Sequence, residues 1–490
     1  ERMSEFSIFC KKLIDNCEMT IYGIAKEAKI ERTSLNRMIA GKRLPAKDFV
    51  DRFCSVLRIT PGEYEQLQQL YMKEKIGKEL YQNRSYILKM LCDMDALQMH
   101  HVDTETEPLL TTNSEISKIA ASTNDRLQGK RMLEQLISNT FSDGKKQTIL
   151  TNFPVEKQYF FEYMEKYAMS YHKKVPVYHY LTIHSNPKRY RNPNCNLEIL
   201  HNIFPWIISE RQEYVPYYSY SSCMPEDLVS QIWIYYVLTK EYALFYNADL
   251  SSAICITNAK QISLFRDTLK KAQENMKKFV LVGNESEDFN GFYLDTIQDY
   301  GKMVKSIRYC PNYIQHLKEE DAVLRMKTML ESDLCEEYSD IISRQIFDNE
   351  EEEYFNVFSE QGLEYFCNTG CVVAQELANE KEQGFSVRER IAILEKMVES
   401  NRSGERKSYL CNSQYFGLEK ISMELFENGS LAIIKYQEKK PQKVIFIEES
   451  SICEAFEDFF DSLDEMGLVY ELEKSSRIIQ KWINKLYQRT

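Results

Sequence analysis

Hydrophobic side chains recur at helical spacing through the first 76 residues, with short polar breaks between the runs. The first run consists of Phe6, Phe9, Leu13 and Ile14. Positions separated by three, four or seven residues lie on one face of a helix, so this run predicts a first helix. A second helix is predicted over 21–29 with Thr20 as its N-cap, because a threonine hydroxyl can accept a hydrogen bond from a free amide of the first turn.

Three more helices are predicted before residue 77. The third covers 32–40, and Gly41 follows it where a C-cap glycine is common. Its inward positions are Leu35, Met38 and Ile39. Pro45 suits the first turn of a fourth helix, and the sequence from Thr60 to Glu63 has the spacing of a capping box that opens a fifth. The pattern therefore predicts a five-helix domain over 1–76.

Beyond residue 77 the pattern changes from helices to helices that alternate with strands. Residues 77–125 are predicted to be a helical connector and linker, because 100–115 are polar and contain a proline. Alternation of strands and helices favours an α/β lobe over 126–284 and a second over 386–490. Residues 285–385 are predicted to be a mainly helical insertion. Its acidic run, DNEEEEYF, lacks the spaced aspartates and turn glycine of a calcium loop and indicates a solvated face.

An internal repeat supports two α/β lobes. Residues 131–152 align with 391–412 as a helix, a polar turn and a strand, pairing Gly144 with Gly404, Leu150 with Leu410 and Asn152 with Asn412. Residues 241–271 align with 429–463 as two strands and a helix, pairing Ala243 with Ala432 and Phe265 with Phe456. The spacing predicts a second copy that is shorter between its two matching parts. The fold class predicted is thus α plus α/β, with five N-terminal helices before a duplicated α/β body that carries a helical insertion.

Charge is distributed unevenly along the chain. The formal net charge is −12, which argues against a body that coats nucleic acid. Residues 20–58 nevertheless contain nine Lys or Arg against four Asp or Glu. A local positive excess of this kind is typical of a DNA-binding module. The alternative is a helical bundle whose basic face contacts other proteins.

The order of helices and turns in the first 75 residues resembles the helix-turn-helix domain of Cro/CI-type (XRE) transcriptional regulators. The resemblance rests on IAKEAKI, on RTSLNRMIAGKRLP and on ITPGEYEQL. It implies a sequence-specific interface in which Arg and Asn contact base edges and the loop after Gly41 contacts phosphate. The DNA-binding residues it implies are Arg32, Thr33, Ser34, Asn36, Arg37, Lys42 and Arg43. Lys29 departs from the pattern, since the family usually has glycine there.

The body is similar in element order to a degenerate phospholipase D-like α/β sensor domain. Enzymes of that family need two His-x-Lys-x4-Asp motifs. Only His316 and Lys318 begin such a motif here, and Val323 occupies the place of the aspartate. No catalytic residue is therefore predicted.

The cysteines and the remaining histidines of the sequence are interpreted as structural residues. Thirteen cysteines without a repeated spacing indicate reduced thiols, and Cys367 and Cys371 lack the further ligands of a zinc site. His100 and His101 form a linker pair with no ligand set around them. Neither cofactor nor metal is predicted. The aromatic segments YFFEYMEKY and EYVPYYSYSS, with Trp206 and Trp233, indicate either core packing or a ligand cleft.

These observations predict a cytoplasmic, DNA-binding transcriptional regulator that acts as a homodimer on a double-stranded operator. The body is expected to sense a ligand, to oligomerise, or both, with a small molecule or a peptide as the effector. No apolar run is long enough to cross a bilayer, so no membrane partner is expected. Two alternatives stay open: an enzyme or defence effector with an autoregulatory helix-turn-helix module, and a peptide-sensing regulator.

Overall fold

The structure is a computed structural model of all 490 residues. It describes residues 3–96, 119, 121–189, 192–209, 213–221, 235–284, 289–313, 316, 354–371, 384–411, 421–437 and 440–489. The chain divides into two units, Glu1–Ser85 and Tyr86–Thr490. Each unit is described separately below.

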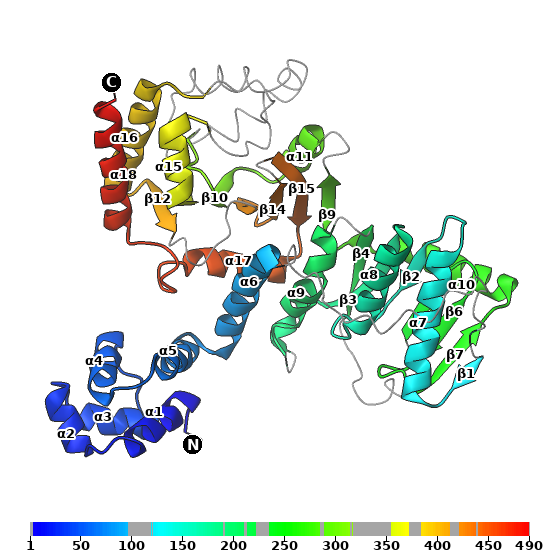
Figure 1. Ribbon diagram of the computed structural model, residues 1–490, viewed down its shortest axis with the longest axis horizontal. Helices are drawn as coiled ribbons and strands as arrows, with labels where there is room; N and C mark the ends of the chain where they lie inside the picture. Colours follow the sequence, from blue (N-terminus) through cyan, green and yellow to red (C-terminus); the bar gives the residue numbers. More distant parts are fainter. Residues whose placement is uncertain are drawn as a thin grey trace. The chain divides into compact units, whose positions relative to one another are not determined.

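Unit 1 is a helical domain, shown in blue in Figure 1. Its helices are α1 (Glu5–Asp15), α2 (Ile21–Glu27), α3 (Arg32–Ile39), α4 (Lys47–Leu57) and α5 (Pro61–Ile76). The buried faces of all five helices share one hydrophobic core, in which Ile24, Leu35 and Phe53 are fully buried. Helix α6 (Lys78–Ala96) follows, and its buried residues Ile87, Met90 and Leu91 belong to the core of unit 2.

Local capping signals explain where several of these helices begin. The Thr20 hydroxyl accepts a hydrogen bond from the Gly23 amide, as predicted. Thr60 and Glu63 form the predicted capping box at the start of α5. One prediction is wrong: α4 begins at Lys47, two residues after Pro45. The Pro45 carbonyl instead accepts a hydrogen bond from the Tyr71 hydroxyl at 3.0 Å, so this proline ends the loop before the helix.

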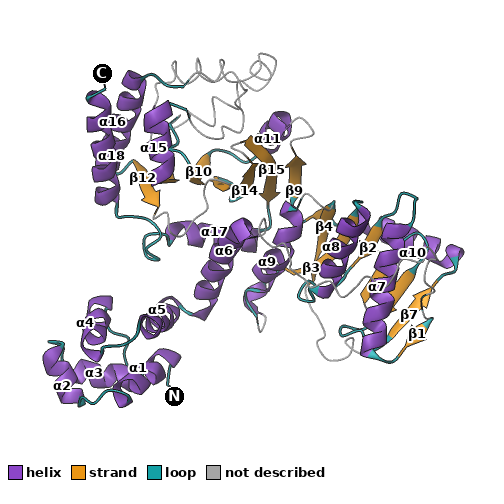
Figure 2. Ribbon diagram, viewed as in Figure 1, coloured by secondary structure: helices purple, strands orange, loops and turns teal. Residues whose placement is uncertain are grey.

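Unit 2 contains two mixed sheets with helices on both faces (Figure 2). The strands of the first sheet are β1 (Ser122–Thr123), β2 (Ile149–Thr151), β3 (Val177–His184), β4 (Tyr214–Ser221), β5 (Tyr235–Leu238), β6 (Ala243–Tyr246), β7 (Ala253–Ile256) and β8 (Lys277–Lys278). Their helices are α7 (Arg126–Ser142), α8 (Tyr159–Tyr171), α9 (Cys195–Ile208) and α10 (Ala259–Gln273). We call this sheet and its helices lobe 1. Its strand order is β1-β7-β6-β5-β2-β3-β4-β8.

The second sheet and its helices, lobe 2, begin at residue 281. The strands are β9 (Leu281–Asn284), β10 (Met303–Arg308), β11 (Tyr354–Ser359), β12 (Arg406–Cys411), β13 (Ile421–Phe426), β14 (Leu431–Gln437) and β15 (Lys440–Ile447). The helices described are α11 (Phe289–Ile297), α15 (Glu360–Thr369), α16 (Val387–Ser403), α17 (Ser450–Asp461) and α18 (Leu472–Tyr487). The strand order, read from the other edge, is β9-β15-β14-β13-β10-β11-β12.

The two lobes have the same topology. In each, three neighbouring strands are parallel (β2-β3-β4 and β10-β11-β12), and the three strands that follow in sequence form an antiparallel meander. The first strand of each lobe pairs with the last meander strand, and each meander ends in a helix, α10 or α17. Seven strands agree in order and direction between the lobes, and lobe 1 has in addition the short strand β8 beside β4. The body therefore contains two copies of one seven-strand topology.

The topology corrects the lobe boundaries predicted from sequence. Strand β9 was expected at the end of the first lobe, and β10 and β11 lie within 285–385, which was predicted to be mainly helical. All three are strands of the second sheet. The second lobe therefore does not start at residue 386 and is not a shortened copy.

The predicted internal repeat is only partly correct. Strand β2 corresponds to β10, whereas the sequence aligned it with β12, which corresponds to β4. The later part joins equivalent elements, β6–β7–α10 and β14–β15–α17, but Ala243 packs on the α10 side of its sheet and Ala432 on the α11 side. Successive strand residues face opposite ways, so the Ala243–Ala432 pairing is one residue out of register.

Aromatic residues of lobe 1 fill its core. Phe160 and Phe161 of α8 are buried, and the rings of Phe161 and Trp206 stack with centroids 4.7 Å apart. Of the two interpretations of the YFFEYMEKY segment, the structure supports core packing. Trp233 lies outside the described residues.

Candidate nucleic-acid interface

The link between α2 and α3 is a tight turn with a lysine in a left-handed conformation. Helix α2 ends in two hydrogen bonds typical of a Schellman motif: the Ile30 amide to the Ala25 carbonyl at 3.0 Å, and the Lys29 amide to the Lys26 carbonyl at 3.3 Å. Lys29 has a φ of +53°, a left-handed conformation that glycine adopts more readily than other residues. The turn keeps its geometry without the glycine.

Helix α3 ends in the same motif, this time with a glycine. The Gly41 amide donates to the Met38 carbonyl at 3.1 Å, and the Lys42 amide donates to the Arg37 carbonyl at 2.9 Å. Gly41 has a φ of +68°. The motif turns the chain sharply after α3 and places Lys42 and Arg43 directly beyond its last turn.

The inner face of α3 is fixed to the rest of unit 1 by burial and by one buried hydrogen bond. Leu35 and Met38 are fully buried. The Ser7 hydroxyl of α1, itself buried, donates to the Met38 carbonyl at 2.7 Å. Because one side of α3 is held in this way, its opposite side has a defined orientation.

The predicted contact residues lie mainly on that opposite side. Arg32, Thr33, Asn36 and Arg37 are exposed, as are Lys42 and Arg43 in the following loop. Ser34 differs, because its side chain is partly buried and its hydroxyl donates to Glu31 Oε2 at 2.7 Å. The outer face of α3 thus presents two guanidinium groups and one carboxamide to solvent. The Ser34 hydroxyl is already hydrogen-bonded to Glu31.

Two residues that the sequence analysis left out belong to the same region. Arg52 of α4 pairs with Asp48, and its Nη1 also donates to the Lys29 carbonyl at 3.4 Å, so it supports the turn. Tyr22, at the second position of α2, is 62% exposed. A large exposed aromatic near the start of the helix before α3 is a further candidate contact. Only its position on the polar side of α2 could have indicated it from sequence.

The charge of the chain is divided between the units with opposite sign. Residues 1–85 contain 16 Lys and Arg against 12 Asp and Glu, a net charge of +4. Residues 86–490 contain 46 against 62, a net charge of −16. Polyanions are attracted by positive fields, so unit 1 is the favoured part of the chain for binding them.

Two histidines of unit 2, His179 and His316, are buried and have lowered pKa values. His179 of β3 contacts the Tyr214 hydroxyl through Nδ1 at 2.6 Å and the Phe153 carbonyl through Nε2 at 2.7 Å. Since a carbonyl can only accept, Nε2 carries the proton and Nδ1 accepts from tyrosine. Burial lowers the pKa of His179 to about 4 and that of His316 to about 3. Both rings are therefore neutral near pH 7.

A buried polar cluster lies on the α11 side of the second sheet. Glu424 is fully buried, accepts a hydrogen bond from the Tyr293 hydroxyl at 2.6 Å and forms an ion pair with Arg308. Beside it, the Ser306 hydroxyl contacts the Tyr354 hydroxyl at 2.8 Å. A carboxylate at such depth needs a cation and donors of this kind to stay charged. Among the described residues of lobe 2, Glu424 is the charged residue with the lowest exposure.

Other residues singled out from the sequence have ordinary surroundings or lie outside the described residues. Cys367 is buried in α15, and burial raises its thiol pKa to about 12. Within the described ranges no three His, Cys, Asp or Glu gather as a metal site would require. The residues outside are His100, His101, Lys318, Val323, Asn412 and residues 348–353 of the acidic run.

Comparisons of the chain with protein-family models, with curated proteins and with solved structures returned no match. In the part of the chain that the structure describes, every helix is too short or too polar to cross a bilayer.

Proposed function

We propose that this protein is a sequence-specific, DNA-binding transcriptional regulator, with unit 1 as its helix-turn-helix domain and unit 2 as a ligand-sensing or oligomerisation body. The exposed face of α3 carries this proposal. Arg32, Asn36 and Arg37 project from a helix whose other face is fully buried, in the only positively charged unit of the chain.

In this proposal α3 enters the major groove of DNA. Arg32 and Arg37 suit guanine, whose O6 and N7 accept two parallel hydrogen bonds, and Asn36 suits adenine. Lys42 and Arg43, on the loop fixed by Gly41, would neutralise phosphates and set the register of α3 along the groove. Ser34, which the resemblance also implied as a contact, would first have to exchange its hydrogen bond to Glu31.

Unit 2 is proposed to dimerise the protein and to respond to a small-molecule or peptide effector. A helix-turn-helix domain contacts only one half-site, and a dimer places two such domains one helical turn apart on the operator. Two lobes that share the order of seven strands support the proposed likeness to a degenerate phospholipase D-like body, which is a duplicated α/β fold. The buried polar cluster around Glu424 is the candidate region for an effector response.

The direct test is selection of binding sites from a random duplex library with the full-length protein, followed by affinity measurements on the selected site. The variant Arg32→Ala plus Arg37→Ala should keep the fold, since both side chains are exposed. Each lost bidentate contact costs about 1–3 kcal/mol, so the loss of two should lower affinity about 30- to 20,000-fold.

A charge-matched control removes two lysines from the same unit. Lys11 and Lys12 are exposed on α1, and Lys11→Ala plus Lys12→Ala lowers the charge of unit 1 by the same amount. If the two double variants weaken binding equally, α3 has no special role. If the library yields no preferred sequence, the regulator assignment is wrong.

A further inference from the structure

Five lysines from three separate segments lie together at one end of the strands of lobe 1. Lys145 and Lys146 precede β2, Lys173 and Lys174 precede β3, and Lys240 lies in the hairpin between β5 and β6. Strands β2 and β3 are parallel, and β5 runs antiparallel to β2. All three segments therefore lie at the amino-terminal end of the parallel strands. We call these five residues the lysine edge.

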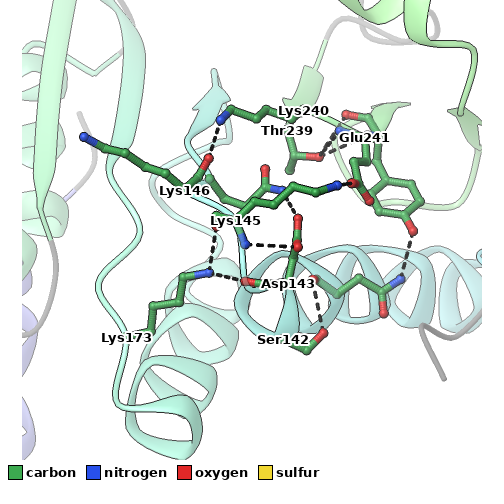
Figure 3. Close-up of polar contacts among 11 residues, drawn as sticks. Ser142, Asp143, Lys145, Lys146, Lys173, Thr239, Lys240 and Glu241 are labelled. Carbon is green, nitrogen blue, oxygen red and sulfur yellow. Dashed lines mark hydrogen bonds and ion pairs between the residues drawn. The ribbon is translucent and has the colours of Figure 1, made fainter. Parts of the chain in front are cut away.

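Hydrogen bonds to main-chain carbonyls hold the three segments together (Figure 3). Lys173 Nζ donates to the Asp143 carbonyl at 2.6 Å and to the Lys145 carbonyl at 3.3 Å. Lys240 Nζ donates to the Lys146 carbonyl. The ammonium groups of Lys173 and Lys240 thus hold the three segments together. Carbonyl groups are neutral, so these bonds leave both positive charges uncompensated.

Two carboxylates lie among these lysines. The carboxylate of Asp143 accepts hydrogen bonds from the Lys145 amide at 3.1 Å and from the Gln147 side chain, and these bonds lower its pKa. Glu241 accepts from Lys145 Nζ at 3.3 Å. Glu213, directly before β4, lies at the same end, since the Val177 amide donates to its carbonyl at 2.8 Å, and Arg266 donates there to the Thr148 hydroxyl at 2.8 Å. Five lysines and Arg266 against three acids leave a local charge of +3 in a unit whose net charge is −16.

Two of the lysines point their charge at solvent. Lys146 and Lys174 are exposed, and among the described residues neither ammonium group forms an ion pair or a hydrogen bond. In Figure 3 the Lys146 side chain extends away from the contacts that its own carbonyl makes. These two residues are available to an outside partner.

The second lobe shows that the fold does not need these lysines. The turn before β10, which corresponds to that before β2, contains Asp299 and a single lysine, Lys302. The hairpin between β13 and β14, which corresponds to that of Lys240, contains Glu427, whose carboxylate accepts from the Lys302 amide at 2.9 Å. At two of the three segments lobe 1 thus has lysines where lobe 2 has carboxylates, and the counterpart of the third segment, before β11, lies outside the described residues.

We propose that the lysine edge binds the phosphate backbone of duplex DNA without regard to sequence. The proposal rests on the function proposed above, because it adds a second DNA contact to the same protein. Lysine binds phosphate as a point charge, and several lysines spaced along an edge match a line of phosphates. Recognition by α3 would select the site, and the lysine edge would add affinity that depends on salt.

The test compares salt dependence in full-length variants. Lys146→Ala plus Lys174→Ala removes the two unengaged charges and leaves Lys173 and Lys240 to hold the segments. Lys277→Ala plus Lys278→Ala is the matched control, since both lysines are exposed on edge strand β8, which pairs with the middle of β4. Duplexes with and without the selected operator are titrated between about 50 and 200 mM salt.

Loss of two phosphate contacts should lower the slope of log affinity against log salt by about 1.8, on both duplexes alike. The preference for the operator should not change, and the β8 control should keep the wild-type slope. An unchanged slope in Lys146→Ala plus Lys174→Ala overturns the proposal, and so does an equal loss in the control. Competition by an acidic polypeptide that exceeds competition by DNA also overturns it, in favour of a protein partner.

Failure of the proposed function gives a different result. Wild-type protein could show no operator preference but bind duplex DNA with a salt slope that the lysine-edge variant loses. That result supports DNA binding by the lysine edge and contradicts the regulator assignment. Conversely, Arg32→Ala plus Arg37→Ala could abolish operator preference while the lysine-edge variant binds like wild type. That result supports the regulator assignment and contradicts DNA binding by the lysine edge. Absence of any binding to duplex DNA at about 50 mM salt overturns both.

Discussion

Replacing Lys29 by glycine should stabilise unit 1, although it removes a side chain. Lys29 has a φ of +53° at the end of α2, and its side chain is exposed. The left-handed conformation brings Cβ close to the following carbonyl, and glycine has no Cβ. The hydrogen bonds of the turn are made by main-chain atoms, so Lys29→Gly keeps them.

The size of the effect is the difference between two opposing terms. Relief of the left-handed strain is worth about 1–2 kcal/mol. The greater freedom of glycine in the unfolded chain costs about 0.5–1 kcal/mol. The net stabilisation is about 0.5–1 kcal/mol, which lowers the population of locally opened molecules about two- to fivefold.

The same substitution three residues earlier is the matched control. Lys26 is exposed like Lys29, but it lies in the last turn of α2 and has a helical backbone, whereas Lys29 is left-handed. Glycine in a helix interior is less stable than a good helix former by about 1 kcal/mol. Lys26→Gly removes the same charge as Lys29→Gly, so electrostatic effects cancel in the comparison and the two variants should shift stability in opposite directions.

Amide hydrogen exchange of the full-length protein measures this locally. Peptides that cover α2 and α3 should exchange more slowly than wild type in Lys29→Gly and faster in Lys26→Gly, while peptides from unit 2 should not change. Faster exchange in Lys29→Gly, or a shift of both variants in the same direction, would show that the turn does not store the inferred strain.

Three further substitutions test buried polar contacts. Ser7→Ala removes the hydrogen bond to the Met38 carbonyl and should destabilise unit 1 by about 1–3 kcal/mol, measured by exchange in α3. Lys443 is buried and donates to the Ile207 and Ser209 carbonyls at 2.9 Å, so Lys443→Met should lower the melting temperature of unit 2, whereas no change would show the contacts to be dispensable. The pKa of His179 is about 4 when folded, below its ordinary value of 6.5; the stability from its neutral ring is present above pH 6.5 and lost as pH falls toward 4, up to about 3 kcal/mol. His179→Gln should flatten the decline in melting temperature over that range.

The elements of unit 1 could be predicted because their signals are local. The Thr20 cap and the capping box at Thr60 each depend on residues within one helical turn. Pro45 was misplaced because a proline just before a helix and a proline in its first turn have the same local pattern. The Ser7–Met38 hydrogen bond joins residues 31 positions apart, and no local pattern indicates it.

The duplication of the body could be predicted, but its alignment could not. An amphipathic helix, a polar turn and a buried strand form one repeating unit of any α/β sheet, so α7–β2 resembles α16–β12 although the two units occupy different positions. The sequence of a short buried strand also does not determine its register. The predicted alignment was shifted by one residue, so it assigned Ala432 to the wrong face of the sheet. Pairing between distant strands decides both questions.

The lysine edge was missed for the same reason. Lys145, Lys173 and Lys240 are distant in sequence, and each belongs to a short polar turn of ordinary composition. Only the parallel pairing of β2 with β3 and the antiparallel pairing of β2 with β5 bring the three turns to one edge.

The two lobes distinguish what the fold requires from what it only permits. Next to the meander hairpin, on the side of the sheet that faces α7 and α8, lobe 1 has Val237, which is fully buried. On the corresponding side of lobe 2, Glu424 precedes the last paired residue of β13, Leu425, just as Val237 precedes Leu238 in β5. Glu424 is paired with Arg308 and Tyr293. A buried ion pair is generally no more stable than hydrophobic residues of similar volume. Since the same topology accepts valine, stability of the fold does not explain Glu424. The lysine edge of lobe 1 and the Glu424 cluster of lobe 2 are thus two differences in charge between the copies that the shared topology does not require.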